Sequence, residues 1–94
     1  MPGWILENSD YTLRLPPGSV KTIGRTARAD FIVTGALVSR LHCRVSAGAS
    51  DQLVVEDLES TNGTFVNGAR VDRARLDCGD RVRIGRLELV VEKN

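Results

Sequence analysis

The chain has 94 residues, of which 41% are hydrophobic and 27% are charged, and its formal net charge is +1. This composition is typical of one globular domain and excludes a disordered chain. No apolar run approaches the roughly 18 residues of a membrane span, and the N-terminus lacks the basic start and long apolar run of a signal peptide. We therefore expect an intracellular protein, nuclear or cytoplasmic, whose direct partner is neither a membrane nor a nucleic acid.

Short strands separated by turns are predicted along the whole chain. Apolar and polar residues alternate in several segments, for example Arg81-Val82-Arg83-Ile84, as they do in a half-buried strand. The predicted strands cover residues 4–6, 11–15, 20–23, 31–33, 43–47, 53–56, 64–66, 81–84 and 87–91. Because no helical repeat persists between the nine glycines and the prolines, this pattern predicts an all-β sandwich or barrel.

Two Asn-Gly pairs mark tight turns in the second half of the chain, Asn62-Gly63 and Asn67-Gly68. Asn tolerates positive φ and Gly adopts it without steric cost, so both pairs suit turn positions. Only a very short strand fits between them, and a strand pinned at both ends makes its flanking loops stiff. Stiff loops at one end of a sandwich are a common place for a binding site.

The chain has too few metal-ligating residues in a suitable pattern for a metal centre. Cys43 and Cys78 lie far apart in the sequence, and His42 is the one histidine. Two cysteines and one histidine do not complete a closed zinc site. We expect both cysteines to be small buried residues, and we expect neither a metal nor a cofactor.

Three clusters of residues become informative when they are taken together and in order. The first is Gly24-Arg25 at the end of a predicted strand, the second is Ser39-Arg40-Leu41-His42, and the third is Ser60-Thr61-Asn62-Gly63-Thr64. Each cluster alone is typical of a turn or of a solvated surface. Their combination, with Asp57 before the third cluster and Asn67-Gly68 after it, resembles the forkhead-associated (FHA) domain.

The resemblance extends from about residue 4 to the last predicted strand. It implies a β-sandwich of about eleven strands, with a phosphothreonine-peptide site on the loops at one end. We expect residues 1–94 to be a single FHA domain of a larger multidomain protein. The resemblance further implies a binding module and not an enzyme.

By this resemblance, five residues bind the peptide: Arg25, Ser39, Arg40, Thr61 and Asn62. Their chemistry suits the ligand, because a phosphothreonine carries about −1.5 to −2 charges and three strong acceptor oxygens. The arginines supply guanidinium groups, and Ser39 and Thr61 supply hydroxyl donors. The amide of Asn62 can donate to and accept from the backbone of an extended peptide.

Five further residues are expected to support the site without binding the ligand: Gly24, His42, Gly63, Asn67 and Gly68. Gly24 would allow the close backbone approach that aims the Arg25 side chain. The resemblance implies that the His42 ring holds the serine segment in shape. A hydrolase triad of Ser39, His42 and Asp57 is disfavoured, because no nucleophile elbow precedes Ser39.

The predicted function is recognition of a phosphothreonine-containing protein or peptide in phosphorylation-dependent signalling, with the DNA-damage response as one setting. A bacterial Ser/Thr-kinase signalling adaptor of the same fold is an alternative. A degenerate FHA scaffold that docks unphosphorylated partners is another, although the intact set of five binding residues argues against it. The resemblance also implies that the loop before Ser39 contributes to a pocket for the third ligand residue after the phosphothreonine. This loop, residues 34–38, is short, apolar and uncharged, so we expect an aliphatic side chain at that ligand position.

Overall fold

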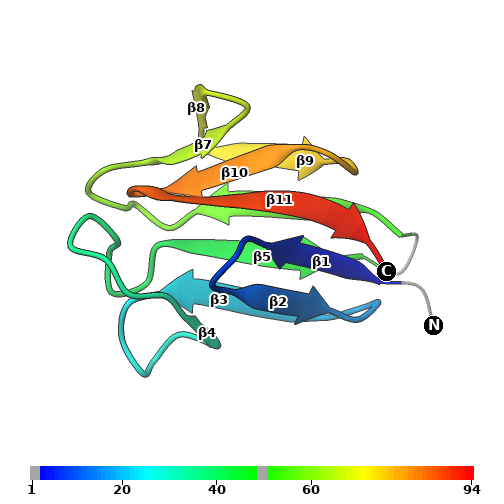
Figure 1. Ribbon diagram of the computed structural model, residues 1–94, viewed down its shortest axis with the longest axis horizontal. Helices are drawn as coiled ribbons and strands as arrows, with labels where there is room; N and C mark the ends of the chain where they lie inside the picture. Colours follow the sequence, from blue (N-terminus) through cyan, green and yellow to red (C-terminus); the bar gives the residue numbers. More distant parts are fainter. Residues whose placement is uncertain (1–2, 49–50) are drawn as a thin grey trace.

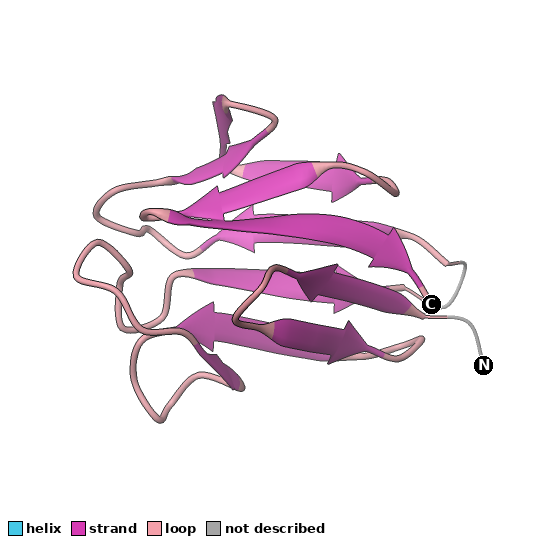
Figure 2. Ribbon diagram, viewed as in Figure 1, coloured by secondary structure: helices cyan, strands magenta, loops and turns pink. Residues whose placement is uncertain are grey.

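The computed structural model describes residues 3–48 and 51–94, and the regular structure in these residues is β-strand throughout (Figure 2). The strands are β1 (Trp4–Glu7), β2 (Thr12–Leu15), β3 (Val20–Gly24), β4 (Phe31–Ile32), β5 (Cys43–Ala47), β6 (Leu53–Asp57), β7 (Thr64–Val66), β8 (Ala69–Val71), β9 (Arg73–Leu76), β10 (Arg81–Ile84) and β11 (Leu87–Lys93). The prediction of an all-β fold with about eleven strands is confirmed. None of the described segments is a helix that could cross a membrane.

The strands form two sheets that pack face to face (Figure 1). One sheet has six strands in the order β2-β1-β11-β10-β7-β8, and the other has five in the order β4-β3-β5-β6-β9. β3 and β4 pair in parallel, whereas β5 and β6 at the centre of their sheet pair antiparallel. Successive side chains of a strand point to opposite faces, so each sheet presents one apolar face to the other.

The core follows from this alternation. On β5 the buried residues are Cys43, Val45 and Ala47, and on β6 they are Leu53 and Val55. Because β5 and β6 are in register, these side chains lie on the same inner face. Burial of a Val or Leu side chain contributes about 1.5–3 kcal/mol, so the two inner faces hold the sandwich together and fix the loops at its ends.

The strands β8 and β9 are absent from the strands predicted above. Both lie at sheet edges, and their residues Arg70, Arg73 and Arg75 are exposed. Charged side chains on an edge strand protect it from pairing with other chains, but they leave few large apolar residues to reveal the strand in the sequence. In β9 only Leu76 is both large and buried.

One of the two predictions about cysteine is wrong. Cys43 is buried as expected, and its burial, together with the nearby Asp57 carboxylate, raises the pKa of its thiol to about 12. Cys78 is exposed, because it lies in the turn between β9 and β10 and not on an inward-facing strand position. The backbone N–H of Asp77 donates to the Asp80 carboxylate across that turn, at 2.7 Å.

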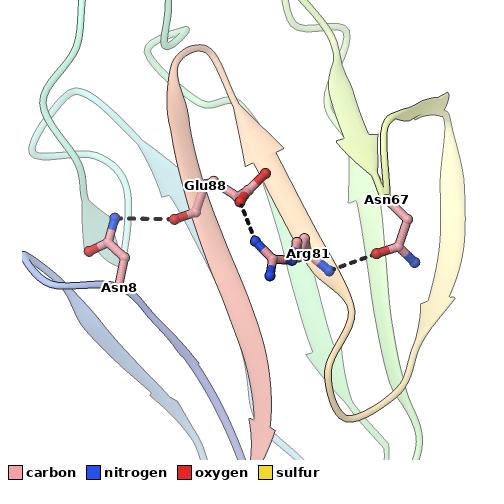
Figure 3. Close-up of polar contacts among 4 residues, drawn as sticks. All are labelled: Asn8, Asn67, Arg81 and Glu88. Carbon is pink, nitrogen blue, oxygen red and sulfur yellow. Dashed lines mark hydrogen bonds and ion pairs between the residues drawn. The ribbon is translucent and has the colours of Figure 1, made fainter.

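Asn67 and Gly68 form the two-residue turn between β7 and β8. Their φ values are +50° and +86°, and Val66 pairs directly with Ala69, as in a type I′ hairpin. The side-chain amide oxygen (Oδ1) of Asn67 accepts a hydrogen bond from the backbone N–H of Arg81 at 3.0 Å. Figure 3 shows this bond next to the ion pair of Arg81 with Glu88, so the end of β7 is fixed to the body of the sheet.

Candidate functional site

Three loops lie together at the end of the sandwich on the left of Figure 1: β3–β4, β4–β5 and β6–β7. They enclose an open cleft of about 480 Å³. Its walls are formed by Arg25, Ala36, Leu37, Val38, Ser39, Arg40, Leu41, Glu59, Thr61 and Asn62. All five residues that the sequence singled out for peptide binding therefore line one cleft, although up to 37 positions separate them in the chain.

Gly24 ends β3 and lies against the backbone of the β4–β5 loop. A β-carbon at this position would lie 2.0 Å from the carbonyl oxygen of Arg40, a distance that no side chain tolerates. The absence of a side chain thus lets the β3–β4 and β4–β5 loops touch. The expectation that Gly24 allows a close backbone approach agrees with this contact.

Arg25 is fixed to the β4–β5 loop at two points. Its backbone N–H donates to the carbonyl oxygen of Ser39 at 3.1 Å, and its Nε donates to the carbonyl oxygen of Val38 at 2.8 Å. Among the described residues, the terminal Nη groups of Arg25 make no hydrogen bond. The stem of this side chain is therefore held in place while its two terminal amino groups are available to an anion.

Ser39 and Thr61 join the second loop to the third. The backbone N–H of Thr61 donates to the Ser39 hydroxyl oxygen at 3.1 Å. This bond uses a lone pair of the oxygen and leaves the hydroxyl hydrogen free to donate elsewhere. The side chains of Thr61 and Arg40 are exposed beside it, so hydroxyl donors and a second cation lie at the same cleft wall.

His42 connects the same two loops from below the cleft and is fully buried. Its Nδ1 accepts a hydrogen bond from the backbone N–H of Ser39 at 3.1 Å, and its Nε2 lies 2.8 Å from the carbonyl oxygen of Gly63. Since Nδ1 accepts, the Nε2 hydrogen is the one that donates to Gly63, which defines a neutral ring. This geometry fits the supporting role expected for His42 and for Gly63.

The Asp57 carboxylate organises the β6–β7 loop, a role that the sequence analysis did not assign. It accepts hydrogen bonds from the backbone N–H and the hydroxyl of Ser60, at 3.1 and 2.5 Å, and from the hydroxyl of Thr64 at 2.8 Å. Burial works against the charged form, but the hydrogen bonds from Ser60 and Thr64 outweigh it, and the pKa of Asp57 lies below its ordinary value. The spacing of Asp57 and Ser60 is typical of a side chain that caps its own turn.

These contacts do not assemble a catalytic triad. His42 contacts the backbone of Ser39 and not its hydroxyl, and the Asp57 carboxylate is directed to Ser60 and Thr64. Within residues 3–48 and 51–94, no group of three His, Cys, Asp or Glu side chains is placed to hold a metal ion.

Asn62 lies at the rim where the β6–β7 loop meets the β4–β5 loop. Its amide nitrogen donates to the carbonyl oxygen of Leu37 at 3.1 Å, which uses one of its two N–H hydrogens. The amide oxygen and the second N–H thus keep the capacity to pair with the backbone of another chain. By contrast, Asn67 and Gly68 do not line the cleft, and they lie at the end of β7 opposite to the β6–β7 loop.

Comparison of the sequence with known protein families identifies the family of this chain. The FHA domain family matches residues 21–85, a range that includes every residue of the cleft. This chain belongs to the FHA domain family. The resemblance noted in the sequence is therefore confirmed.

Several mycobacterial FHA proteins are similar in sequence. The ABC transporter ATP-binding/permease protein Rv1747 of Mycobacterium tuberculosis is 44% identical over 88 residues, which are 92% of this chain and 10% of that protein. The FHA domain-containing protein FhaA of the same organism is 37% identical over 92 residues, covering 88% of this chain and 17% of that protein. The chain thus spans a small part of either relative.

Solved FHA domains share the fold along nearly the whole chain. The FHA domain of CT664 from Chlamydia trachomatis has a TM-score of 0.90 and 23% identity, with 96% of both chains covered. An FHA domain solved in a study of phosphothreonine-dependent interactions has a TM-score of 0.84 and 34% identity over 97% of this chain and 94% of that one. The FhaA FHA domain complexed with the intracellular domain of Rv3910 has the same score and identity, over 98% and 100% of the two chains.

Proposed function

We propose that this domain binds phosphothreonine peptides through the cleft between its three loops, and that Arg25, Ser39, Arg40, Thr61 and Asn62 form the binding surface. The observation that carries the proposal is the hydrogen bond from the backbone N–H of Thr61 to the Ser39 hydroxyl oxygen. This bond fixes the β4–β5 loop to the β6–β7 loop and leaves the Ser39 hydroxyl hydrogen free to donate to an anion. The exposed guanidinium groups of Arg25 and Arg40 line the same cleft.

The groups that line the cleft suit a phosphorylated peptide better than free inorganic phosphate. A phosphoryl group with about −1.5 to −2 charges needs charged donors that are already in place before it arrives. Arg25 meets this need, because its Nε is fixed on Val38. Asn62 adds a group with both donor and acceptor capacity at the rim, which fits the alternating N–H and C=O groups of an extended peptide.

The relatives support a signalling setting. The FHA domain of FhaA has been solved with the intracellular domain of Rv3910, and another similar FHA domain is known for phosphothreonine-dependent interactions. Because Rv1747 and FhaA are bacterial proteins, we favour an adaptor that reads a Ser/Thr kinase product in a bacterium. Neither relative supports the DNA-damage setting, which stays a prediction from the sequence.

A second pocket of about 350 Å³ adjoins the cleft and shares Ala36, Leu37 and Val38 with it. Leu87 adds a further apolar wall, and Arg86 stands exposed at its edge, a cation that the sequence analysis did not place there. Burying an aliphatic side chain contributes about 1.5–3 kcal/mol, whereas an exposed ion pair contributes about 0–1 kcal/mol. The proposal therefore keeps an aliphatic preference at the third ligand residue after the phosphothreonine.

Isothermal titration of a phosphothreonine peptide and its unphosphorylated counterpart tests the proposed function. The wild type should bind only the phosphorylated peptide, and Arg25→Ala should lose that binding while remaining folded. Arg75→Ala is the matched control, because it removes an exposed arginine from the outer face of the five-stranded sheet. Equal affinity for both peptides would instead favour a scaffold that docks unphosphorylated partners.

A further inference from the structure

Glu59 is the one acidic residue among those that line the cleft. It lies in the β6–β7 loop, two positions before Thr61, and its side chain is exposed. Its backbone is in the left-handed region, with φ at +55°. Two independent features therefore coincide at one residue: an unfavourable backbone conformation and a carboxylate in a cleft suited to anions.

The conformation of Glu59 is imposed by the loop. The backbone N–H of the following residue, Ser60, is bound to the Asp57 carboxylate, and the Ser60 hydroxyl both donates to that carboxylate and accepts from the N–H of Gly63. These bonds fix the turn in which Glu59 lies. Glycine adopts positive φ without cost, whereas a residue with a β-carbon is disfavoured there. The turn itself thus gives no reason for a glutamate.

The carboxylate of Glu59 also has no partner in the part of the domain that the structure describes. Among residues 3–48 and 51–94, the ion pairs involve other residues, and Glu59 makes no hydrogen bond through its side chain. It shares the cleft with Arg25 and Arg40 without pairing to either. The cleft is therefore polarised, with two cations and one anion on its walls, and the anion is free to meet a ligand.

We infer that Glu59 is a specificity-determining residue, which favours phosphothreonine peptides with a lysine or arginine close to the phosphothreonine and disfavours peptides with a further acid or phosphate there. The inference rests on the proposed function, because it concerns the residues that flank the same phosphothreonine. A cation on the ligand would pair with the Glu59 carboxylate while the phosphate occupies the arginines. A second anion would meet like charge.

The expected effect is modest because Glu59 is exposed. Ion pairs at exposed positions change affinity by about two- to fivefold, and salt screens them. The carboxylate also repels the phosphate itself. Removing its charge should therefore raise the affinity for a peptide with neutral flanks by up to about threefold, which is the opposite of what loss of an ordinary binding residue does.

The experiment is a fluorescence-anisotropy titration of phosphothreonine peptides that differ only beside the phosphothreonine. One peptide has alanine at the two positions on either side, and the others carry a single lysine or aspartate at one of these positions. The proteins are the wild type, Glu59→Gln, which removes the charge, and Glu92→Gln, which removes an exposed carboxylate from β11 as a charge-matched control.

In the wild type we expect at least one lysine peptide to bind about two- to fivefold more tightly than the aspartate peptide of the same position. Glu59→Gln should abolish that difference, Glu92→Gln should keep it, and 0.5 M salt should suppress it. A difference that Glu59→Gln leaves intact, or no difference in the wild type, overturns the inference. If the neutral peptide fails to bind at all, it is the proposed function that fails.

A second variant separates ligand selection from a structural role. Glu59→Gly removes the strain of the left-handed backbone together with the carboxylate, so its melting temperature should rise by a few degrees while the lysine preference disappears. A fall in melting temperature would show that the Glu59 side chain supports the fold, which would overturn the inference that the cleft holds it for the ligand.

Discussion

The α-carbon of Gly24 and the carbonyl group of Arg40 are in direct contact, so a β-carbon on Gly24 would lie 2.0 Å from the Arg40 oxygen. The N–H of the next residue, Arg25, donates to the carbonyl oxygen of Ser39. The spacing of the two loops that carry the arginines is therefore set by a residue without a side chain.

Gly24→Ala should reduce the free energy of unfolding by about 2–3 kcal/mol, because the added methyl group meets backbone that cannot rotate away. Urea denaturation measures this loss. Gly48→Ala serves as the control, since the nearest described atom to its β-carbon would be the carbonyl oxygen of Gln52, at an ordinary 3.6 Å. If both variants unfold at the same urea concentration, the contact of Gly24 with Arg40 does not constrain the loops.

Ser39→Ala should weaken binding of a phosphothreonine peptide by about tenfold or more, because it removes a donor to a charged acceptor. It also removes the oxygen that accepts from the Thr61 N–H, so the free energy of unfolding should fall by about 0.5–1.5 kcal/mol. Calorimetry and urea denaturation check the two effects. Ser46→Ala, on the outer face of β5, should change neither, and unchanged binding by Ser39→Ala would remove this hydroxyl from the site.

The Asp57 carboxylate should make the stability of the domain depend on pH. Its pKa is lowered in the folded state, so its contribution is present above the pKa of the unfolded chain and is lost as the pH falls through the folded value. Asp57→Asn should therefore destabilise the domain at pH 7, and the difference from the wild type should shrink as the pH falls below the pKa of the unfolded chain. Melting curves across this range test the trend.

The control for this pH series is Asp77→Asn, which changes an exposed carboxylate in the turn between β9 and β10. It should follow the wild type at every pH. A constant destabilisation by Asp57→Asn from pH 7 to pH 3 would mean that the loop depends on the shape of Asp57 and not on its charge.

A phosphothreonine peptide should bind about tenfold or more tightly than the matched phosphoserine peptide, because a methyl group in a small apolar notch is worth about 1–3 kcal/mol. The leucine and valine side chains of the β4–β5 loop supply apolar surface in the cleft. Titration of the two peptides at equal ionic strength measures the ratio. Equal affinities would show that the cleft reads the phosphate and the backbone without reading the methyl group.

The sequence predicts the strands whose inner face is apolar and misses β8 and β9, two of the four edge strands. Alternation in β6 and β10 places Val55 and Ile84 in the core as expected, because burial of one face leaves a period of two in the sequence. In β8 and β9 the exposed arginines leave too few apolar residues for this alternation of apolar and polar residues to be recognised. The sequence wrongly predicts that Cys78 is buried, because residue type alone does not distinguish a small residue in a turn from one in the core.

The site could be predicted only in part. The order of three motifs predicts five of the residues that line the cleft, because it ties distant loops together in a way that spacing alone does not. The hydrogen bonds between Asp57 and Ser60 could have been predicted, because a serine three positions after an aspartate is typical of capped turns. The left-handed backbone of Glu59 had no signal, since its conformation is set by the bonds of its neighbours.

The pairing of β1 with β11 brings Trp4 next to Lys93, and this pair lies at the end of the sandwich away from the cleft (Figure 1). A force that pulls these two residues apart would break the ladder one rung after another, from Trp4–Lys93 to Glu7–Val90, and would not load all rungs at once. Under tension the domain should thus peel open between β1 and β11, starting at the end of the sandwich opposite the cleft.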